Sequence, residues 1–256
     1  MNDSKIKICC QTIKLPERKI YDTDIDIEGF KLFKFKISDY IAVISELKKL
    51  LNAQEIDRAE RYYHQHDSQR FIISKAILKL ILAKEIGTDV STVKFSKNSN
   101  KKPYLALHPE LHFNVSHAKN YALIVIGTRP VGVDVECISK DFNFTEILPT
   151  VFSKPEMNEV LNAANKNLEF YKLWTRKEAV VKATGNGIDD NLIKINILDG
   201  DNVVEYNDLG VKQSMQVVSF AVDQDYIGAI AFKEGRVGVK NIILYPLDIF
   251  LKGVIH

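Results

Sequence analysis

The sequence predicts an α+β protein, and two observations carry that prediction. A long helical pattern runs from Asp67 to Ile86 and another from Leu168 to Ala183, whereas short alternating segments typical of strands follow from Ile193 onward. Each half of the chain therefore holds one long helix and a set of strands. At 256 residues the chain is long enough for one large domain or for two similar α+β halves with a joint near residues 127–131.

In the first half, the hydrophobic pattern predicts strands over 5–13, 30–37, 93–95, 113–115 and 121–127, and a polar loop over 96–103. An amphipathic helix is expected over 38–51. Asn52 followed by Glu55 resembles a capping box and predicts a helix to Tyr63. The strong helix over 67–86 should end at Gly87, because glycine readily adopts the left-handed conformation of a helix C-cap.

In the second half, a strand is expected from Val131 after Pro130. Ser153 with Glu156 forms a second capping box, and the helix it begins should break near 162–167. The helix over 168–183 should end in the segment 184–187. Strands over 193–198, 203–206, 215–222 and 226–232 predict an antiparallel meander, and the apolar tail from Asn241 is expected to dock on the body.

Composition indicates an ordinary globular protein, since 46% hydrophobic and 27% charged residues suffice for a core and argue against disorder. Cys9, Cys10 and Cys137 show neither disulfide nor metal-ligand spacing, which favours a reducing compartment. The polar start, Met1 to Lys7, lacks a signal-peptide core, and no apolar run reaches membrane-spanning length. We therefore expect a cytoplasmic protein with no membrane partner.

Charge is unevenly distributed. Residues 58–102 hold ten Lys and Arg against four Asp and Glu, so this window carries +6 although the whole chain carries +2. A basic first half and a later acidic cluster suit an anionic ligand together with a divalent cation. The alternative is a solvated helix with basic loops.

The most informative stretch is Val131-Gly132-Val133-Asp134-Val135-Glu136. Alternation along a strand should bury the valines and place Asp134 and Glu136 side by side on the other face. We expect Gly132 to leave that face open for a ligand. The alternative is that both carboxylates simply lie on the exposed face of an edge strand.

A third carboxylate, Glu178, comes from the helical stretch Trp174 to Lys182, with Lys182 one turn further along the same face. Three carboxylates of this kind suit Mg²⁺ bound together with a phosphate-bearing substrate. The alternative is an exposed ion pair between Glu178 and Lys182. Trp174 and Phe170 are expected to pack into the core.

Other candidate residues are less specific. Ser116 and His117 are neighbours on a predicted strand and should point in opposite directions, which excludes a nucleophile–base pair and a hydrolase of that type. His117, Arg70 and Lys102 are each able to contact phosphate, although each alone is more often structural or solvated. The sequence has no glycine-rich phosphate loop.

Taken together, three motifs in order resemble the 4′-phosphopantetheinyl transferases, in particular the larger surfactin-synthetase-activating type. The motifs are Phe113 to His117, Gly132 to Glu136 and Trp174 to Lys182, and weaker matches occur at 61–63, 67–70 and 101–103. The resemblance implies a pseudo-twofold pair of similar α+β halves, each with a long helix on an antiparallel sheet. Residues 1–127 are expected to form the N-terminal half, with the nucleotide contacts, and 128–256 the C-terminal half, with the carboxylates. One active site lies between them.

The resemblance also implies an activity: transfer of the phosphopantetheine arm of coenzyme A to a serine of an apo acyl or peptidyl carrier protein, with release of adenosine 3′,5′-bisphosphate. Asp134, Glu136 and Glu178 are implied to bind Mg²⁺, and Lys182 to contact the phosphates. His117 and Arg70 are implied to hold the 3′-phosphate. Lys102 and Pro103 should border the adenine pocket with Ser116 nearby, and Arg58 falls at a basic phosphate contact.

Several points stay open at this level. Glu178 is the candidate general base, but another carboxylate or a metal-bound water would also serve, and Mn²⁺ is an alternative to Mg²⁺. Lys101 and Glu55 depart from the family pattern, as do Cys137 and Ile138. A non-catalytic module that binds coenzyme A or a carrier protein and a metal-dependent phosphohydrolase are the competing functions. The carrier protein and its pathway are not specified, no nucleic-acid partner is expected, and two halves within one chain favour a monomer.

Overall fold

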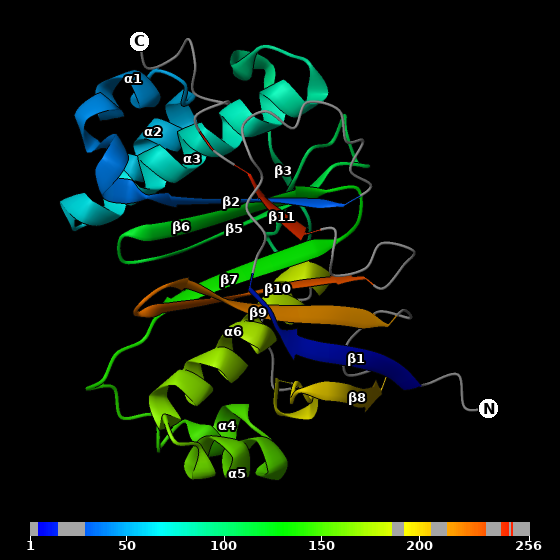
Figure 1. Cartoon of the computed structure of the whole chain (residues 1–256). Helices are drawn as coiled ribbons and strands as arrows, with labels where there is room; N and C mark the ends of the chain where they lie inside the picture. Colours follow the sequence, from blue (N-terminus) through cyan, green and yellow to red (C-terminus); the bar gives the residue numbers. More distant parts are fainter. Residues whose placement is uncertain are drawn as a thin grey trace.

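The computed structural model describes residues 5–14, 29–185, 192–205, 214–233, 242–245 and 247. Its elements stack in four layers, helices on sheet on sheet on helices (Figure 1). This confirms the predicted α+β class with two similar halves. None of the helices in this part of the chain combines the length and apolar character that a membrane span needs.

The first half is built on a sheet ordered β11-β2-β6-β5. Its strands are β2 (Phe30–Lys36), β5 (His112–Ala118), β6 (Tyr121–Gly127) and β11 (Ile242–Tyr245), with a small hairpin of β3 (Ser96–Lys97) and β4 (Pro103–Tyr104). Its helices are α1 (Ile44–Lys48), α2 (Ala53–Glu60) and α3 (Gln65–Ile86), with 3-10 helices at Ile37–Val43 and Val90–Thr92. The apolar face of α3 packs on this sheet through residues such as Ile73, Ile77 and Ile81.

The second half is built on a sheet ordered β7-β10-β9-β1-β8. Its strands are β1 (Lys5–Thr12), β7 (Val131–Cys137), β8 (Gly200–Glu205), β9 (Met215–Asp223) and β10 (Tyr226–Lys233). Its helices are α4 (Leu148–Val151), α5 (Lys154–Asn162) and α6 (Lys166–Thr184), with a 3-10 helix at Leu192–Lys194. Helix α6 packs on this sheet as α3 does on the other.

A third core lies between the two sheets. The alternating valines predicted from the sequence, Val131, Val133 and Val135, are all buried there against residues from β2, β6 and β10. Because adjacent residues of a strand face opposite sides, this burial turns Asp134 toward α6. Asp134 is itself only 3% exposed, which excludes the exposed edge-strand alternative for that carboxylate.

The two terminal strands are exchanged between the halves. β1 lies in the second sheet, parallel to β9, and β11 lies in the first sheet, parallel to β2 (Figure 1). The predicted antiparallel pairing is confirmed for the other strand pairs of both sheets, whereas the pairs β1–β9 and β11–β2 are parallel. The prediction of a simple C-terminal meander was wrong, because β8 pairs with β1. Local alternation identifies a strand but does not reveal which strand pairs with it. Docking of the tail is confirmed for Ile242–Tyr245.

Local signals located the helix ends well. Asn52–Glu55 and Ser153–Glu156 both form capping boxes, and Gly87 and Gly185 end α3 and α6 in the left-handed conformation. The segment 38–51 was predicted as one helix but is a 3-10 helix followed by the short α1. Strands predicted at 93–95 and 193–198 were wrong, because the chain there forms 3-10 turns and irregular backbone. Of the predicted stop at 184–187, Asn186 and Gly187 lie outside the described residues, as does Tyr206 of the strand predicted at 203–206.

Candidate active site at the junction of the two halves

The three predicted carboxylates gather where β7 meets α6. Asp134 is 3% exposed and Glu178 is 8% exposed, whereas Glu136 is half-buried. Asp134 Oδ1 accepts hydrogen bonds from Ser116 Oγ at 2.8 Å and from Lys182 Nζ at 2.5 Å. Lys182 therefore pairs with Asp134, and among the ion pairs of the described residues it has none with Glu178. The exposed-ion-pair alternative for Glu178 and Lys182 is wrong.

Two carboxylate oxygens in this group are buried without a partner. Among the described residues, Asp134 Oδ2 and Glu178 Oε1 have no hydrogen-bond donor. A buried acceptor without a donor loses its hydration with no compensation, so such atoms are rare in folded proteins and call for a specific explanation. A cation or a donor brought by a ligand would satisfy both.

The environment of Glu136 and Glu178 favours their protonated forms. Burial, followed by the charge of Asp134, raises the pKa of Glu136 to about 7, although a hydrogen bond from Trp174 and the charge of Lys182 oppose the shift. Burial also raises the pKa of Glu178, against the opposing charge of Lys182. Like charges close together in a buried site raise one another's pKa until a cation neutralises them.

The oxygen donors of these residues are of the type that binds a divalent cation. Carboxylate oxygens are the ligands that Mg²⁺ prefers, and Asp134 and Glu178 each offer an unpartnered one. The described residues contain no group of three or more His, Cys, Asp or Glu side chains already placed to hold a metal ion. The donor set is thus suitable, and the metal ligands Asp134, Glu136 and Glu178 stay a prediction.

Gly132 was predicted to leave this face open for a ligand, and that prediction was wrong. A Cβ at this position would lie 2.1 Å from the carbonyl oxygen of Ala179 and 2.3 Å from the amide nitrogen of Ala183. The backbone of α6 therefore occupies the space above Gly132, and the glycine permits this close packing of helix on strand. That contact holds the helix carboxylate Glu178 near the strand carboxylates.

Strand β5 joins the two halves at the site. The amide of Val133 donates to Asn114 Oδ1 at 2.9 Å, and the amide of Val135 donates to Ser116 Oγ at 3.3 Å. Side chains of β5 thus satisfy backbone donors on the free edge of β7. Ser116 contacts Asp134, and alternation along β5 turns Ser116 and His117 to opposite sides. The place of Ser116 near an adenine pocket stays a prediction.

A pocket of about 230 Å³ lies beside this junction, between α2, α3 and β5. It brings together three predicted residues, Arg58, Pro103 and His117. Its other lining residues were not predicted; they are Tyr62, Phe71, Ser74, Lys75, Leu78, Phe113, Asn114 and Val115. Positions 71, 74, 75 and 78 share one face of α3, so helical spacing is the signal that would have found four of them.

The remaining predicted cations lie outside this pocket. Arg70 pairs with Asp67 at 2.5 Å and lines a separate cavity of about 410 Å³ with His66 and Lys119. Arg70 is close enough to His117 that its charge, after burial, helps to lower the histidine's pKa. Burial and this charge thus favour the neutral form of His117 by lowering its pKa.

Lys102 has a structural contact that the sequence did not suggest. Its Nζ donates to the carbonyl oxygens of Lys182, Ala183 and Val131 at 2.5, 3.1 and 3.3 Å. It thereby satisfies carbonyl groups at the end of α6, where a helix leaves acceptors unpaired. Burial lowers its pKa to about 8. Lys102 and Pro103 do border a cavity, of about 280 Å³, but the ammonium group is engaged by the backbone.

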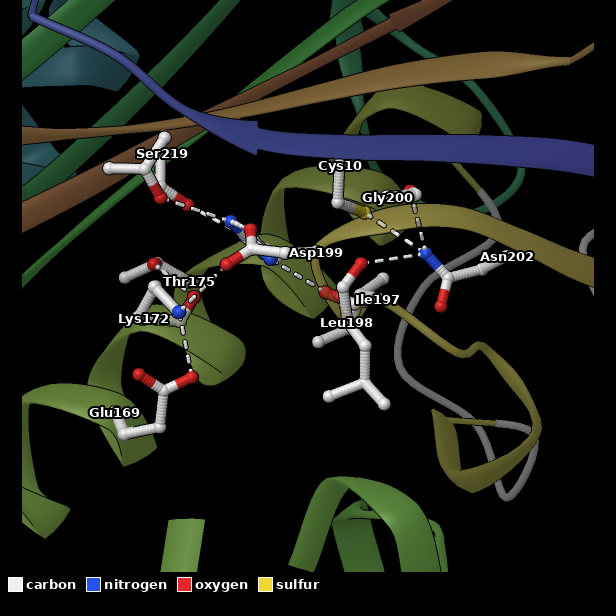
Figure 2. Close-up of polar contacts among 12 residues, drawn as sticks. Cys10, Glu169, Lys172, Thr175, Ile197, Leu198, Asp199, Gly200, Asn202 and Ser219 are labelled. Carbon is white, nitrogen blue, oxygen red and sulfur yellow. Dashed lines mark hydrogen bonds and ion pairs between the residues drawn. The ribbon is translucent and has the colours of Figure 1, made fainter. Parts of the chain in front are cut away.

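Residues next to Glu178 in sequence form a second, contrasting cluster. Arg176 is fully buried and donates to Ser219 Oγ at 2.8 Å, Ile197 O at 2.9 Å and Asp199 Oδ1 at 2.5 Å. Figure 2 shows Asp199 in this network, near Ser219 of β9 and Lys172 of α6. These groups are mutually satisfied, so we assign this cluster to the fold.

The fold and site together define a class: an α+β enzyme whose two halves meet at a carboxylate cluster beside a cation-lined pocket. The comparisons with known proteins agree. Residues 38–129 match the profile of the N-terminal region of 4′-phosphopantetheinyl transferases, and residues 130–231 match that of the 4′-phosphopantetheinyl transferase superfamily.

Three relatives illustrate the similarity. The chain is 33% identical over 164 residues to the 4′-phosphopantetheinyl transferase HetI of a Nostoc species, covering 61% of this chain and 69% of the relative. It is 25% identical over 198 residues to a 4′-phosphopantetheinyl transferase of Bacillus subtilis, covering 72% and 87%. It is 28% identical over 141 residues to Sfp of Bacillus subtilis strain 168, covering 54% and 62%. The chain belongs to the 4′-phosphopantetheinyl transferase family, whose substrate is coenzyme A and whose partners are carrier proteins.

Proposed function

We propose that this enzyme moves the phosphopantetheine arm of coenzyme A to a serine of an apo acyl or peptidyl carrier protein, in a Mg²⁺-dependent reaction. The observation that carries the proposal is a pair of buried carboxylate oxygens, on Asp134 and Glu178 beside Lys182, that have no partner in the described part of the chain. Such a group suits a metal and a diphosphate together, because each would neutralise the charge of the other.

In the proposed reaction the serine oxygen forms a bond to the phosphorus that carries pantetheine. The bond from that phosphorus to the oxygen bridging to the nucleotide breaks, and adenosine 3′,5′-bisphosphate leaves. The serine proton passes to a carboxylate, for which we propose Glu178. Its pKa is raised by burial, and a base is most effective when its pKa lies near the operating pH.

Other residues of the chain position the reactants. Asp134 holds Lys182, whose ammonium group would stabilise the charge that develops on the leaving phosphate. When bound, Mg²⁺ held by Asp134, Glu136 and Glu178 would supply charge neutralisation for the diphosphate. We propose that His117 and Arg58 contact the nucleotide end in the pocket that both line, with the charge of Arg70 close to His117.

The organisation of the chain is part of the proposal. Residues 1–127 and 128–256 would supply the nucleotide contacts and the carboxylates respectively, apart from the exchanged terminal strands. Because both sets of residues come from one chain, a monomer would contain a complete site. Within the part of the chain that the structure describes, Cys9, Cys10 and Cys137 form no disulfide, which supports a reducing, cytoplasmic setting.

Intact-mass measurement of an apo carrier protein tests the function. After incubation with the enzyme, coenzyme A and Mg²⁺, we expect a gain of one phosphopantetheine, which chelator abolishes. The test uses one acyl and one peptidyl carrier protein, with serine-to-alanine carrier variants as controls. Binding of coenzyme A without bisphosphate release would contradict transfer, and phosphopantetheine release without a carrier would indicate a phosphohydrolase.

A further inference from the structure

The last turn of α6, in the second half, is held by a loop from the first half. Lys102 lies in this loop, between β3 and β4, and its Nζ donates to the carbonyl oxygens of Lys182 and Ala183 in that turn. It also donates to Val131 O, where β7 begins. A lysine ammonium group has three donors, so these three contacts use all of them. A single atom thus joins the end of the helix to the start of the strand.

A second side chain of the loop reaches the same helix end. Asn100 Nδ2 donates to the carbonyl oxygen of Gly185 at 2.8 Å. Gly185 also packs closely on the loop, since a Cβ there would lie 3.2 Å from Lys102 Cδ and 3.4 Å from Asn98 Nδ2. The last carbonyl groups of a helix have no partner within the helix and carry a partial negative charge. The loop therefore supplies both the donors and the positive charge that this helix end lacks.

The backbone of the loop is fixed by its own hydrogen bonds. Asn98 Oδ1 accepts from the amides of Asn100 at 3.0 Å and Lys102 at 2.8 Å, and the amide of Asn98 donates to Lys102 O at 3.0 Å. Lys101 adopts a φ of 64°, in the left-handed region that residues other than glycine rarely occupy. Because the turn is closed in this way, Lys102 and Asn100 reach the helix from defined positions.

Lys182 connects this helix end to the carboxylates. Its carbonyl oxygen accepts from Lys102, whereas its own Nζ donates to Asp134 Oδ1 at 2.5 Å and to Ser116 Oγ at 3.2 Å. The main chain and the ammonium group of Lys182 are thus both held by partners outside α6. Release of the main chain would allow the ammonium group to shift, and a displacement of about 1 Å is enough to weaken a contact made in a transition state.

We propose that Lys102 and Asn100 are positioning residues that act through Lys182. They hold the last turn of α6 against β7, so that the Lys182 ammonium group stays at Asp134, where the reaction needs it. The inference rests on the proposed function, because that function makes Lys182 the group that stabilises the leaving phosphate. It assigns Lys102 a role in the rate of transfer that differs from direct contact with coenzyme A, since the donors of its ammonium group end on backbone carbonyl groups.

Steady-state carrier modification by the wild type, Lys102→Met and Lys102→Arg tests the role. Lys102→Met should lower kcat about tenfold to a hundredfold, because the Lys182 ammonium group is no longer held where charge develops. The KM for coenzyme A should stay within about threefold, as expected for a change that acts on the transition state. Lys102→Arg keeps the charge and the donors and should restore most of kcat. Direct contact of Lys102 with coenzyme A would instead raise KM.

Two further variants act as controls. Lys97→Met removes an exposed lysine from the same hairpin and should leave kcat and KM unchanged. Asn100→Ala removes the contact with Gly185 and leaves Lys102 in place, so kcat should fall by a smaller factor, about threefold. Because the Asn100 side chain is exposed, this variant also tests the proposal if Lys102→Met does not fold.

Hydrogen exchange of the free protein, measured by mass spectrometry, tests the contact without turnover. Amides of residues 181–184 should exchange at least about fivefold faster in Lys102→Met than in the wild type, whereas those of residues 168–177 should not change.

The outcomes separate this inference from the proposed function. If the wild type modifies no carrier, the proposed function fails, and the exchange measurement still decides whether the loop holds α6. If the wild type is active but Lys102→Met keeps its kcat, or only raises the KM for coenzyme A, the positioning role is overturned. Equal exchange of residues 181–184 in both proteins also overturns it.

Discussion

Helix α6 carries two groups of buried charges that differ in one respect, whether the protein itself satisfies them. Arg176 and Lys177 are both fully buried, and the donor contacts of both end on protein acceptors. Glu178, the next residue, is buried to a similar degree, but one of its oxygens has no donor among the residues that the structure describes. Within one turn of α6, Arg176 and Lys177 thus stabilise the fold, whereas Glu178 is a candidate for binding a ligand.

The satisfied group fastens α6 to its surroundings. Lys177 Nζ donates to the carbonyl oxygens of Leu192 and Ile195, each at 2.7 Å, and pairs with the fully buried Glu156 at 3.0 Å. Glu156 also accepts from the amides of Ser153 and Ile197. Because every partner comes from within the chain, this group needs no ligand.

The unsatisfied group has the opposite character. Asp134 and Glu178 each retain a buried oxygen for which the described residues offer no donor, and Glu136 and Glu178 have raised pKa values. Such an arrangement is unfavourable in the free protein and becomes favourable only when a cation or a ligand completes it. Satisfaction of hydrogen bonds, more than burial, therefore distinguishes the site from the scaffold.

The largest effect on stability is expected from a substitution that removes one member of the satisfied group. Lys177→Met leaves the Glu156 carboxylate buried without its cation and should lower the free energy of unfolding by about 3–5 kcal/mol. Urea denaturation followed by circular dichroism measures this. Adding Glu156→Gln should recover part of the loss, since no charge is then buried unpaired and glutamine preserves the capping box. If the free energy of unfolding fell by less than about 1 kcal/mol, the Lys177–Glu156 pair would contribute no more than an exposed ion pair.

A change in the unsatisfied group should act on activity instead. Glu178→Gln retains the size of the side chain and should lower kcat/KM for carrier modification at least about a hundredfold. The Tm should stay the same or rise, because a buried carboxylate with an unpartnered oxygen is replaced by a neutral amide. The exposed Glu146→Gln is the matched control. Full activity of Glu178→Gln would exclude its proposed role.

The smallest expected effect is on the pH dependence of stability. The folded-state pKa of Glu136 is raised from 4.5 to about 7, so folding takes up a proton between these values. The associated stability is present below about pH 4.5 and is lost as the pH rises through about 7. In chelator, the Tm of the wild type should therefore fall over this interval more than that of Glu136→Gln.

Adding Mg²⁺ to the same Tm measurement tests whether a cation binds these carboxylates. A cation that binds the ionised carboxylates should raise the Tm at pH 8 by about 2 °C or more, and by less at pH 5.5, where protons compete. Thermal scans with and without Mg²⁺ at both pH values provide the readout. An equal shift at both values would argue against binding at these carboxylates.

The sequence by itself determined the features that depend on near neighbours along the chain. The capping boxes at Asn52–Glu55 and Ser153–Glu156 and the helix ends at Gly87 and Gly185 are as predicted, because each depends on residues within one turn of helix. The alternating valines are buried, as expected. The strand carboxylates Asp134 and Glu136 and the helix carboxylate Glu178 were identified as site candidates because their motifs, in this order, resemble those of the family.

Only the tertiary structure decided the features that depend on residues far apart in sequence. Strand pairing across the whole chain put β1 and β11 in exchanged sheets. Close packing of α6 closed the space above Gly132, engaged Lys102 at the helix end, and brought Ser116 to Asp134. Local patterns show which face of an element is apolar, whereas the partner of a polar side chain is chosen by packing that joins distant segments. The same packing left one oxygen each of Asp134 and Glu178 without a partner among the described residues, and these are the atoms from which the function is inferred.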